Sequence, residues 1–474
     1  MRMNHDDPTA GTEARGLQST ARPRVHFGPT FVIPLALGSM LNPINSTMIS
    51  TALAPIATSF DATVAETGWL IAGLYLTSAV AQPTMGRLAD LFGPRRIYLA
   101  SLLLVALAGL GGIIAPSLGA LVAVRVLLGI GTSGAYPSAM RIFRSQADKL
   151  GVAPPRTAMA ALSLAGISTQ AFGPALGGFV TSAFGWHAIF TVNVPLAFLT
   201  AILVLIWVPK DTPRSAGLSE LVREIDVLGV ALFAAALLSL MIFLMNLDRP
   251  LWWIVPISGV FWGLFWLHSA RRRQPFIDVR MLAANLPLTI TLVRIGLILL
   301  IPYCVMYGFA QWLESSAHYS PGEAGLMTLP MSIMAAVCSL LGARTRGIRA
   351  PFITGAAGGL LGCFSLMFLH SDTPAWLIAT AVMLIGIPLG LTSNPTQTAI
   401  FLQAPAAEIG VAAGLQRTFG YFGAIGAASL LGSMFGAHAT DQGFHALALV
   451  MTAASAFLLI FVLFDRTLPR GAIG

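Results

Sequence analysis

Long uninterrupted apolar segments are the feature that most constrains what this chain can fold into. A helix needs about 20 apolar residues to cross the hydrocarbon core of a bilayer, and the sequence divides into fourteen segments of that kind. These are continuous apolar runs and not ten-residue segments of alternating polarity, so they predict helices and not a β-barrel. The segments lie approximately at residues 30–57, 67–86, 97–115, 119–140, 158–182, 188–208, 227–247, 252–268, 285–311, 323–343, 350–369, 375–400, 410–436 and 444–464.

Charged residues are scarce, at 10% of the 474 residues against 56% hydrophobic residues. Soluble domains carry about 25% charged residues, so this composition favours an all-α membrane protein surrounded by a lipid bilayer. The net charge of +8 is spread singly between apolar runs and forms no basic stripe. We therefore expect no nucleic-acid partner. The three cysteines lie within apolar stretches and form no metal-binding pattern, so we expect no metal site.

The positions of the basic residues predict how the chain is oriented. Basic residues in short loops stay on the cytoplasmic side. With the N-terminus in the cytoplasm and fourteen spans, Arg249 is the one basic residue of 27 that falls outside, while Arg125, Arg294 and Arg417 fall within spans. Both termini are therefore expected in the cytoplasm. Residues 1–28 are predicted to be a disordered tail, and residues 465–474 a second tail.

Two arginine-rich loops indicate an internal duplication. Residues 86–96 join the second and third spans, and residues 342–349, offset by 256 positions, join the tenth and eleventh. The sequence therefore predicts two six-helix halves separated by a linker with two extra transmembrane helices. Transporters are often built this way, with the substrate site between the halves, although channels and membrane enzymes can also be duplicated. The predicted boundaries are 29–208 for the first half, 209–284 for the linker and 285–464 for the second half.

Several short motifs occur in order along the spans. Residues 86–96 read GRLADLFGPRR, residues 125–131 read RVLLGIG and residues 173–178 read GPALGG. In order and placement they resemble the major facilitator superfamily, in particular its fourteen-helix drug:proton antiporter branch, over nearly the whole chain after residue 30. Further elements that continue the resemblance lie at 186–195, 226–229, 275–280, 307–311 and 320–330.

The resemblance implies a secondary active transporter that works by alternating access and needs no cofactor. It implies export of small hydrophobic or amphiphilic compounds, as in multidrug efflux, coupled to protons. It also implies a monomer in the bacterial cytoplasmic (inner) membrane. The sequence contains no HExxH or GxSxG motif and no paired intramembrane carboxylates, which favours a transporter over an enzyme.

The resemblance further implies a conformational latch that biases the equilibrium between two states of a transporter. In the loop, a carboxylate flanked by arginines can pair with them or cap a helix N-terminus, and a static cap is the alternative. In span five, glycine permits close helix approach and proline removes a backbone donor, and generic packing is the alternative. The residues assigned to the latch are Gly86, Asp90, Arg95, Arg96, Gly173 and Pro174.

Polar residues within the spans are the candidates for substrate and proton binding. An unpaired guanidinium at mid-membrane costs several kcal/mol, so Arg125 is predicted to act in coupling together with Glu314, or else to be a structural hydrogen-bond hub. Arg294 and Tyr303 point to opposite sides of an ideal helix, so they should not face the same space. The residues predicted to line the substrate cavity are Asn45, Tyr75, Gln82, Gln170, Arg294, Tyr307, Gln311, Arg417 and Tyr421.

The first span departs from the pattern of the antiporter branch. Members carry an aspartate there, whereas this chain has Asn45, which cannot titrate. None of the 19 acidic residues lies at mid-span, and intramembrane arginines favour a neutral or anionic ligand. The alternative function is therefore an exporter or facilitator of an anionic or neutral metabolite or lipid without proton antiport.

Overall fold

The structure, a computed structural model, is helical throughout the part of the chain that it describes. Eleven helical segments of that part are long and apolar enough to cross a bilayer. The count of fourteen spans stays a prediction, in which α6, α11 and α17 occupy the places of the other three. The described residues are 27–151, 156–211, 226–247, 249–273, 275–343, 347–404, 409–465 and 467; most of the two expected tails lies outside them.

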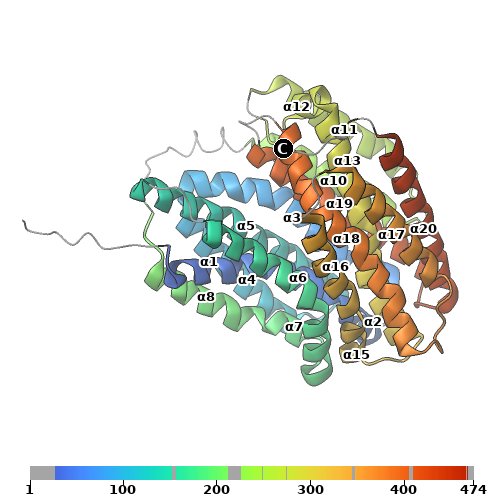
Figure 1. Cartoon of the computed structure of the whole chain (residues 1–474). Coiled ribbons are helices and arrows are strands. Elements are labelled where there is room, and N and C mark those ends of the chain that lie inside the picture. The colour runs from blue at the N-terminus through green and yellow to red at the C-terminus, as the bar shows by residue number, and fades with distance from the viewer. Residues whose placement is uncertain are drawn as a thin grey trace, which may run out of the picture.

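The first group of helices is formed by the N-terminal part of the chain, blue to green in Figure 1. Within it α5 packs against α1, α3 and α4, while α1 also packs against α6 and α8. The elements are α1 (Pro29–Met48), η1 (Ile49–Thr51), α2 (Leu53–Phe60), α3 (Val64–Phe92), α4 (Pro94–Ile114), α5 (Leu118–Leu150), α6 (Arg156–Phe184), α7 (Ala188–Thr191) and α8 (Asn193–Trp207).

The second group repeats this packing with the C-terminal part of the chain. Here α18 packs against α13, α16 and α17, while α13 also packs against α19 and α20, as an internal duplication requires. The domain boundaries themselves stay a prediction. The elements are α13 (Leu286–Cys304), η2 (Val305–Phe309), α14 (Ala310–Ser315), α15 (Pro321–Met327), α16 (Leu329–Ala343), α17 (Arg349–Leu366), α18 (Ala375–Gln403), α19 (Ile409–Phe435) and α20 (Asp441–Phe464).

The two groups meet along two pairs of helices, α3 with α19 and α6 with α15. Between them in the chain come α10 (Val227–Leu244), α11 (Ile254–Arg271) and the short α12 (Val279–Ala284). Helices α10 and α11 pack against each other, and α10 also rests on α3 and α19. The inserted pair therefore covers one of the two seams between the groups (Figure 1).

Corresponding helices of the two groups begin with the same local motif. Thr63 and Glu66 form a capping box at the start of α3, and Ser320 and Glu323 form one at the start of α15. In each, the hydroxyl accepts from the third residue's amide while the glutamate accepts from the cap's amide. These two glutamates therefore fix helix starts.

Corresponding helices of the two groups are also interrupted at matching positions. After α1 the chain continues as a 3-10 turn, η1 at Ile49–Thr51, and α13 continues as a π-helix, η2 at Val305–Phe309. The two interruptions begin 256 positions apart, which is the offset of the arginine-rich loops, and they contact each other. Single-turn π-helices are often found at functional sites.

Candidate functional site: the contact between the two helix groups

A chain of hydrogen bonds joins the two groups where the interrupted helices meet. Tyr307, on η2, donates its hydroxyl proton to the Ser46 carbonyl at 2.7 Å. Its oxygen lies 2.9 Å from the Tyr75 hydroxyl on α3. Because Tyr307 has only one proton to donate, Tyr75 is the donor in that second bond. Residues of both groups are therefore needed to make this chain.

Arg125, on α5, provides hydrogen-bond donors near the end of α1, the helix that carries Ser46. It is 1% exposed, and it donates from Nη1 to the Asn45 carbonyl at 2.8 Å and from Nε to the Leu70 carbonyl at 3.0 Å. The last four carbonyls of a helix have no partner within it, and α1 ends at Met48. Arg125 and Tyr307 therefore donate to two adjacent carbonyls of this kind, those of Asn45 and Ser46. Within the described part of the chain, Nη2 of Arg125 has no hydrogen-bond partner.

Four buried tyrosines surround this point, and we call them the tyrosine cluster: Tyr75, Tyr303, Tyr307 and Tyr421. The Tyr75 ring centroid lies 5.4 Å from that of Tyr303 and 5.3 Å from that of Tyr421. Tyr421, on α19, donates to Oε1 of Gln82, on α3, at 3.2 Å. The structure therefore brings four of the predicted cavity residues, Tyr75, Gln82, Tyr307 and Tyr421, to one place between the groups.

Of two further predicted cavity residues, one contacts the other helix group. The Arg417 guanidinium, on α19, stacks over the Tyr136 ring of α5 at 4.1 Å from its centroid. Gln170, on α6, is exposed, although helical periodicity puts it on the same face as the buried Pro174 and Gly177. That face packs against α1 of the same group at Gly177, so the place of Gln170 in the cavity stays a prediction.

Three other predicted cavity residues are packed inside the protein, away from the tyrosine cluster or turned to their own helix, and their role in the cavity stays a prediction. Asn45 exchanges two hydrogen bonds with Asn193, at 2.6 and 2.8 Å. Arg294 is fully buried and pairs with Asp465. Gln311 is 2% exposed and donates to the Tyr307 carbonyl, one turn earlier. Each of these contacts lies within one helix group, and Nε and Nη1 of Arg294 have no hydrogen-bond partner among the described residues.

Glu314 lies on α14, which contacts η1 and α2 of the other group. Its Oε1 is buried and has no hydrogen-bond partner among the described residues. A buried carboxylate without a partner is costly in its charged form. The coupling role of Glu314 stays a prediction.

Helix α6 packs closely against α1 of its own group and against α15 of the other group. A Cβ on Gly173 would collide with Thr47 of the same group, and a Cβ on Gly178 would collide with the backbone at Pro321 of the other group. A Cβ on Gly325 would likewise meet the Pro174 carbonyl at 2.6 Å. The glycines of α6 therefore let it lie directly against both groups, whereas Gly86 has no such crowding.

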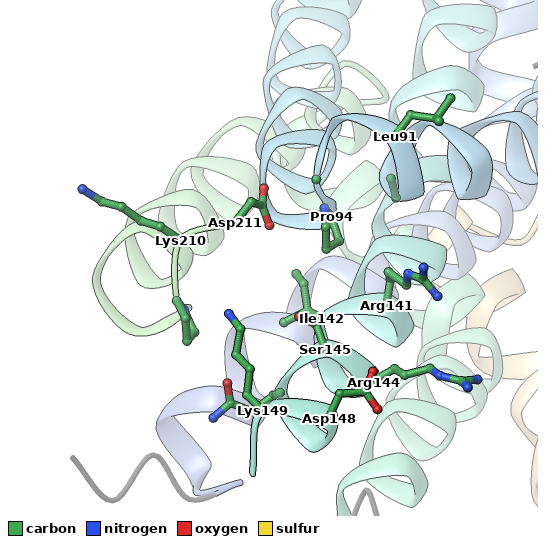
Figure 2. Close-up of a pocket in the computed structure, with 14 residues that line it drawn as sticks. Leu91, Pro94, Arg141, Ile142, Arg144, Ser145, Asp148, Lys149, Lys210 and Asp211 are labelled. Atoms are coloured by element: carbon green, nitrogen blue, oxygen red, sulfur yellow. The ribbon is translucent and has the colours of Figure 1, made fainter. Parts of the chain in front are cut away.

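Next to the predicted loop latch, the start of α4 is capped by an acidic residue (Figure 2). The amides of Arg95 and Arg96, at the start of α4, donate to the carboxylate of Asp211 at 3.1 and 3.0 Å. Gly93 has φ 99°, and a Cβ there would collide with that carboxylate. Asp211 follows α8 and had no sequence signal, so the cap of α4 was missed. The side chain of Asp90 lies outside what the structure describes.

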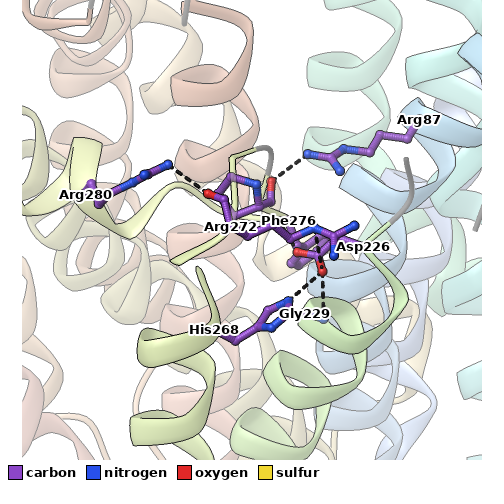
Figure 3. A network of polar contacts seen from close by, with 8 residues as sticks. Arg87, Asp226, Gly229, His268, Arg272, Phe276 and Arg280 are labelled. Atoms are coloured by element: carbon purple, nitrogen blue, oxygen red, sulfur yellow. Dashed lines mark hydrogen bonds and ion pairs between the residues drawn. The ribbon is translucent and has the colours of Figure 1, made fainter. Parts of the chain in front are cut away.

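The inserted helices are tied together by one buried carboxylate, Asp226 (Figure 3). It is 1% exposed and accepts from the amides of Gly229 and Phe276 at 3.2 and 2.7 Å. His268 and Arg272, on and after α11, contribute donors at 2.7 and 3.3 Å. The DVLG motif at 226–229 is thereby explained, because a Cβ at the glycine would collide with the carboxylate.

The same segment connects the insertion to the first group. Nη2 of Arg87, near the end of α3, donates to the Pro275 carbonyl at 2.7 Å, next to the Phe276 amide that bonds Asp226 (Figure 3). The predicted latch loop is therefore in contact with the inserted pair through Arg87. Sequence reasoning had identified the motifs at 226–229 and 275–280 without showing that they meet.

Comparison with solved structures agrees with this architecture. The chain is similar to the xylose transporter XylE from E. coli, in a structure described as a partially occluded inward open conformation, with a TM-score of 0.60. The similarity covers 94% of this chain and 99% of that one at 16% identity. At that identity the likeness concerns the fold.

Comparison with sequences adds relatives of similar length. The chain is 33% identical to the uncharacterized MFS-type transporter YwoD of Bacillus subtilis, over 92% of this chain and 96% of that protein. It is 27% identical to the multidrug resistance protein Stp of Mycobacterium tuberculosis, over 94% and 82%. It is 26% identical to the tetracenomycin C resistance and export protein of Streptomyces glaucescens, over 92% and 80%. Residues 35–428 match the family described as the Major Facilitator Superfamily, and the chain is a member of that superfamily of membrane transporters.

Proposed function

We propose that this transporter exports small hydrophobic or amphiphilic compounds by alternating access, driven by protons. The observation that carries the proposal is the hydrogen-bond chain from Tyr75 through Tyr307 to Ser46. It joins the two helix groups inside the protein, so it can exist only while the groups are closed at this level. Contacts present in one of two states set the balance between those states.

The chemistry around this chain suits amphiphilic compounds. Binding sites for such ligands combine apolar and aromatic walls with a few polar groups, and aromatic rings contribute large apolar faces. The tyrosine cluster supplies such rings, while Gln82 supplies an amide at the seam. The names of two relatives, a multidrug resistance protein and a tetracenomycin C resistance and export protein, support this class of substrate.

The finer assignment is to the fourteen-helix drug:proton antiporter branch. Support comes from the inserted pair α10 and α11, which lies in the chain between the two repeated groups. The placement of basic residues supports both termini in the cytoplasm, and the bacterial relatives support the inner membrane. We further propose that one chain is the working unit and that it is not an enzyme.

A second function is favoured by the positive charge at the seam. Arg417 stacks on the ring of Tyr136, and Nη2 of Arg125 has no partner among the described residues. Both would attract a neutral or anionic ligand more than a cation. An exporter or facilitator of an anionic or neutral metabolite or lipid, without proton antiport, is therefore the competing proposal.

Transport by the purified full chain in proteoliposomes separates these two functions. A pH gradient is imposed, and uptake of a lipophilic cation is measured beside uptake of an organic anion. Gradient-dependent movement of the cation supports the first function. Transport of the anion that ignores the gradient would establish the competing one.

Replacing Glu314 with glutamine is expected to uncouple transport from the pH gradient. Glutamine keeps the size of the side chain but cannot bind and release a proton, so gradient-driven transport should fall at least about tenfold while substrate exchange without a gradient remains. Glu323→Gln is the matched control, because glutamine also completes a capping box. Equal gradient dependence in both variants would exclude Glu314 as the coupling group.

Replacing Tyr307 with phenylalanine is expected to shift the protein toward the state in which the two groups are separated at this level. The change removes both bonds of the hydroxyl, each worth about 1 kcal/mol. Tyr98→Phe is the matched control, because Tyr98 also donates to a backbone carbonyl, that of Pro34 at 2.8 Å, but within the first group. The measurement is the distance distribution between spin labels placed on α2 and α14, and a shift of equal size in both variants would contradict the assignment.

A further inference from the structure

A groove on the surface of the inserted pair lies between the start of α10 and the end of α11. It has a volume of about 530 Å³, within the range of about 300–1,000 Å³ that is common for ligand pockets. All of the residues that line it belong to the insertion. The groove is therefore separate from the seam, where the two helix groups meet and alternating access takes place.

The walls of the groove are apolar and exposed. Leu228 and Leu232 line it from α10, and Leu264 and Leu267 line it from α11. Leu228 is 57% exposed, and Leu264 and Leu267 are 45% exposed each. Because α10 is long and apolar enough to cross a bilayer, exposed leucines on it contact acyl chains, which are as apolar as leucine itself. The groove therefore opens to the lipid.

The same helix face carries a cation at the end of the groove. Leu264, His268 and Arg271 follow one another at helical spacing on α11, and all three line the groove. His268 and Arg272 are turned to the carboxylate of Asp226 (Figure 3). Arg271, by contrast, is exposed and makes no hydrogen bond or ion pair with any residue that the structure describes. No described acidic residue lines the groove, so the charge of Arg271 is not balanced there.

We propose that this groove binds one anionic phospholipid, with an acyl chain between α10 and α11 and the phosphate against Arg271. Arginine at a helix end lays its apolar stem along the helix and puts its guanidinium at headgroup level, where it forms strong hydrogen bonds with phosphate. Basic pockets between transmembrane helices bind anionic headgroups in this way. A zwitterionic lipid would leave the charge of Arg271 unbalanced, so a headgroup with net negative charge is preferred.

The bound lipid lies next to the network that ties the insertion to the first group. His268 and Arg272 line the groove and also hold Asp226. Asp226 in turn bonds the segment at 275–276, which Arg87 of α3 contacts. A lipid in the groove covers this network from the bilayer side. We therefore expect the unfolding temperature of the protein to rise when the lipid binds.

Lipid retention by the full chain tests this proposal. Protein purified in detergent and stripped of lipid is titrated with phosphatidylglycerol or phosphatidylcholine, and bound lipid is counted by native mass spectrometry. Wild-type protein should prefer phosphatidylglycerol. Arg271→Gln should bind it about fivefold more weakly, and Leu264→Trp, which fills part of the groove, should also retain less. Arg273→Gln is the matched control, because it removes the same charge from an exposed position that does not line the groove, and it should bind as wild type does.

Several results would overturn the proposal. Unchanged binding by Arg271→Gln, or equal weakening in Arg273→Gln, would show that Arg271 does not hold the headgroup. Wild-type binding by Leu264→Trp would show that no acyl chain occupies the groove, and release of the lipid by millimolar inorganic phosphate would identify a site for the free anion. Thermal unfolding of each variant shows that it is folded. Lipid binding is measured without transport, so the export assay can fail without affecting this result.

Discussion

Replacing Asp226 with alanine is expected to destabilise the protein by about 3–5 kcal/mol, the range found when one partner of a buried ion pair is removed. The change leaves the amides of Gly229 and Phe276 and the side chains of His268 and Arg272 without the carboxylate that they share. The measurement is thermal or denaturant unfolding of the detergent-solubilised chain. We also expect lower transport, because Arg87 contacts the same segment through Pro275.

Asp278→Ala is the control for this prediction. Asp278 also begins a helix, accepting from the amides of Arg280 and Met281, but it is partly exposed. Loss of a cap of that kind costs about 1 kcal/mol. Similar losses in the two variants would show that the buried network around Asp226 adds nothing beyond a helix cap.

Replacing Arg125 with alanine is expected to abolish transport and to destabilise the protein. The carbonyls of Asn45 and Leu70 would lose their charged donor inside the protein, at about 1–3 kcal/mol for each unsatisfied group. Arg125→Lys should recover only part of the loss, because an ammonium lacks the planar fork that reaches two carbonyls on different helices. Transport in proteoliposomes and unfolding temperature are measured together.

Arg249→Ala provides the matched loss of charge at an exposed position, and it should change neither quantity. A fully active Arg125→Lys variant would show that the positive charge alone matters. In that case the two carbonyl bonds would have no role in holding α1 against α5 and α3.

The duplication and the helical nature of the chain could be predicted from sequence because they depend on short-range patterns. Apolar runs and the 256-residue offset are visible in a single chain. The tyrosines were also identified, since Tyr303 and Tyr307 are one turn apart and must share a helix face. That they lie beside Tyr75 could not be predicted, because this contact depends on how the two groups pack.

The pairing of buried polar residues could not be predicted in the same way. Arg294 and Asp465 lie at the two ends of the second group in sequence, and Asn45 and Asn193 lie 148 positions apart. Nothing in the local pattern of any of these residues names its partner. The sequence therefore identified the buried polar residues but not the residues with which they pair.

The matched interruptions η1 and η2 divide the first helix of each group into a longer and a shorter helical segment. The two interruptions are in contact with each other. We therefore expect the short segments beyond them, α2 and α14, to move together. Separation of the groups at that end is then expected to be accompanied by bending at the two turns. The rates of amide hydrogen exchange at Ile49–Thr51 and at Val305–Phe309 should accordingly rise together in the Tyr307→Phe variant, because the two turns bend together.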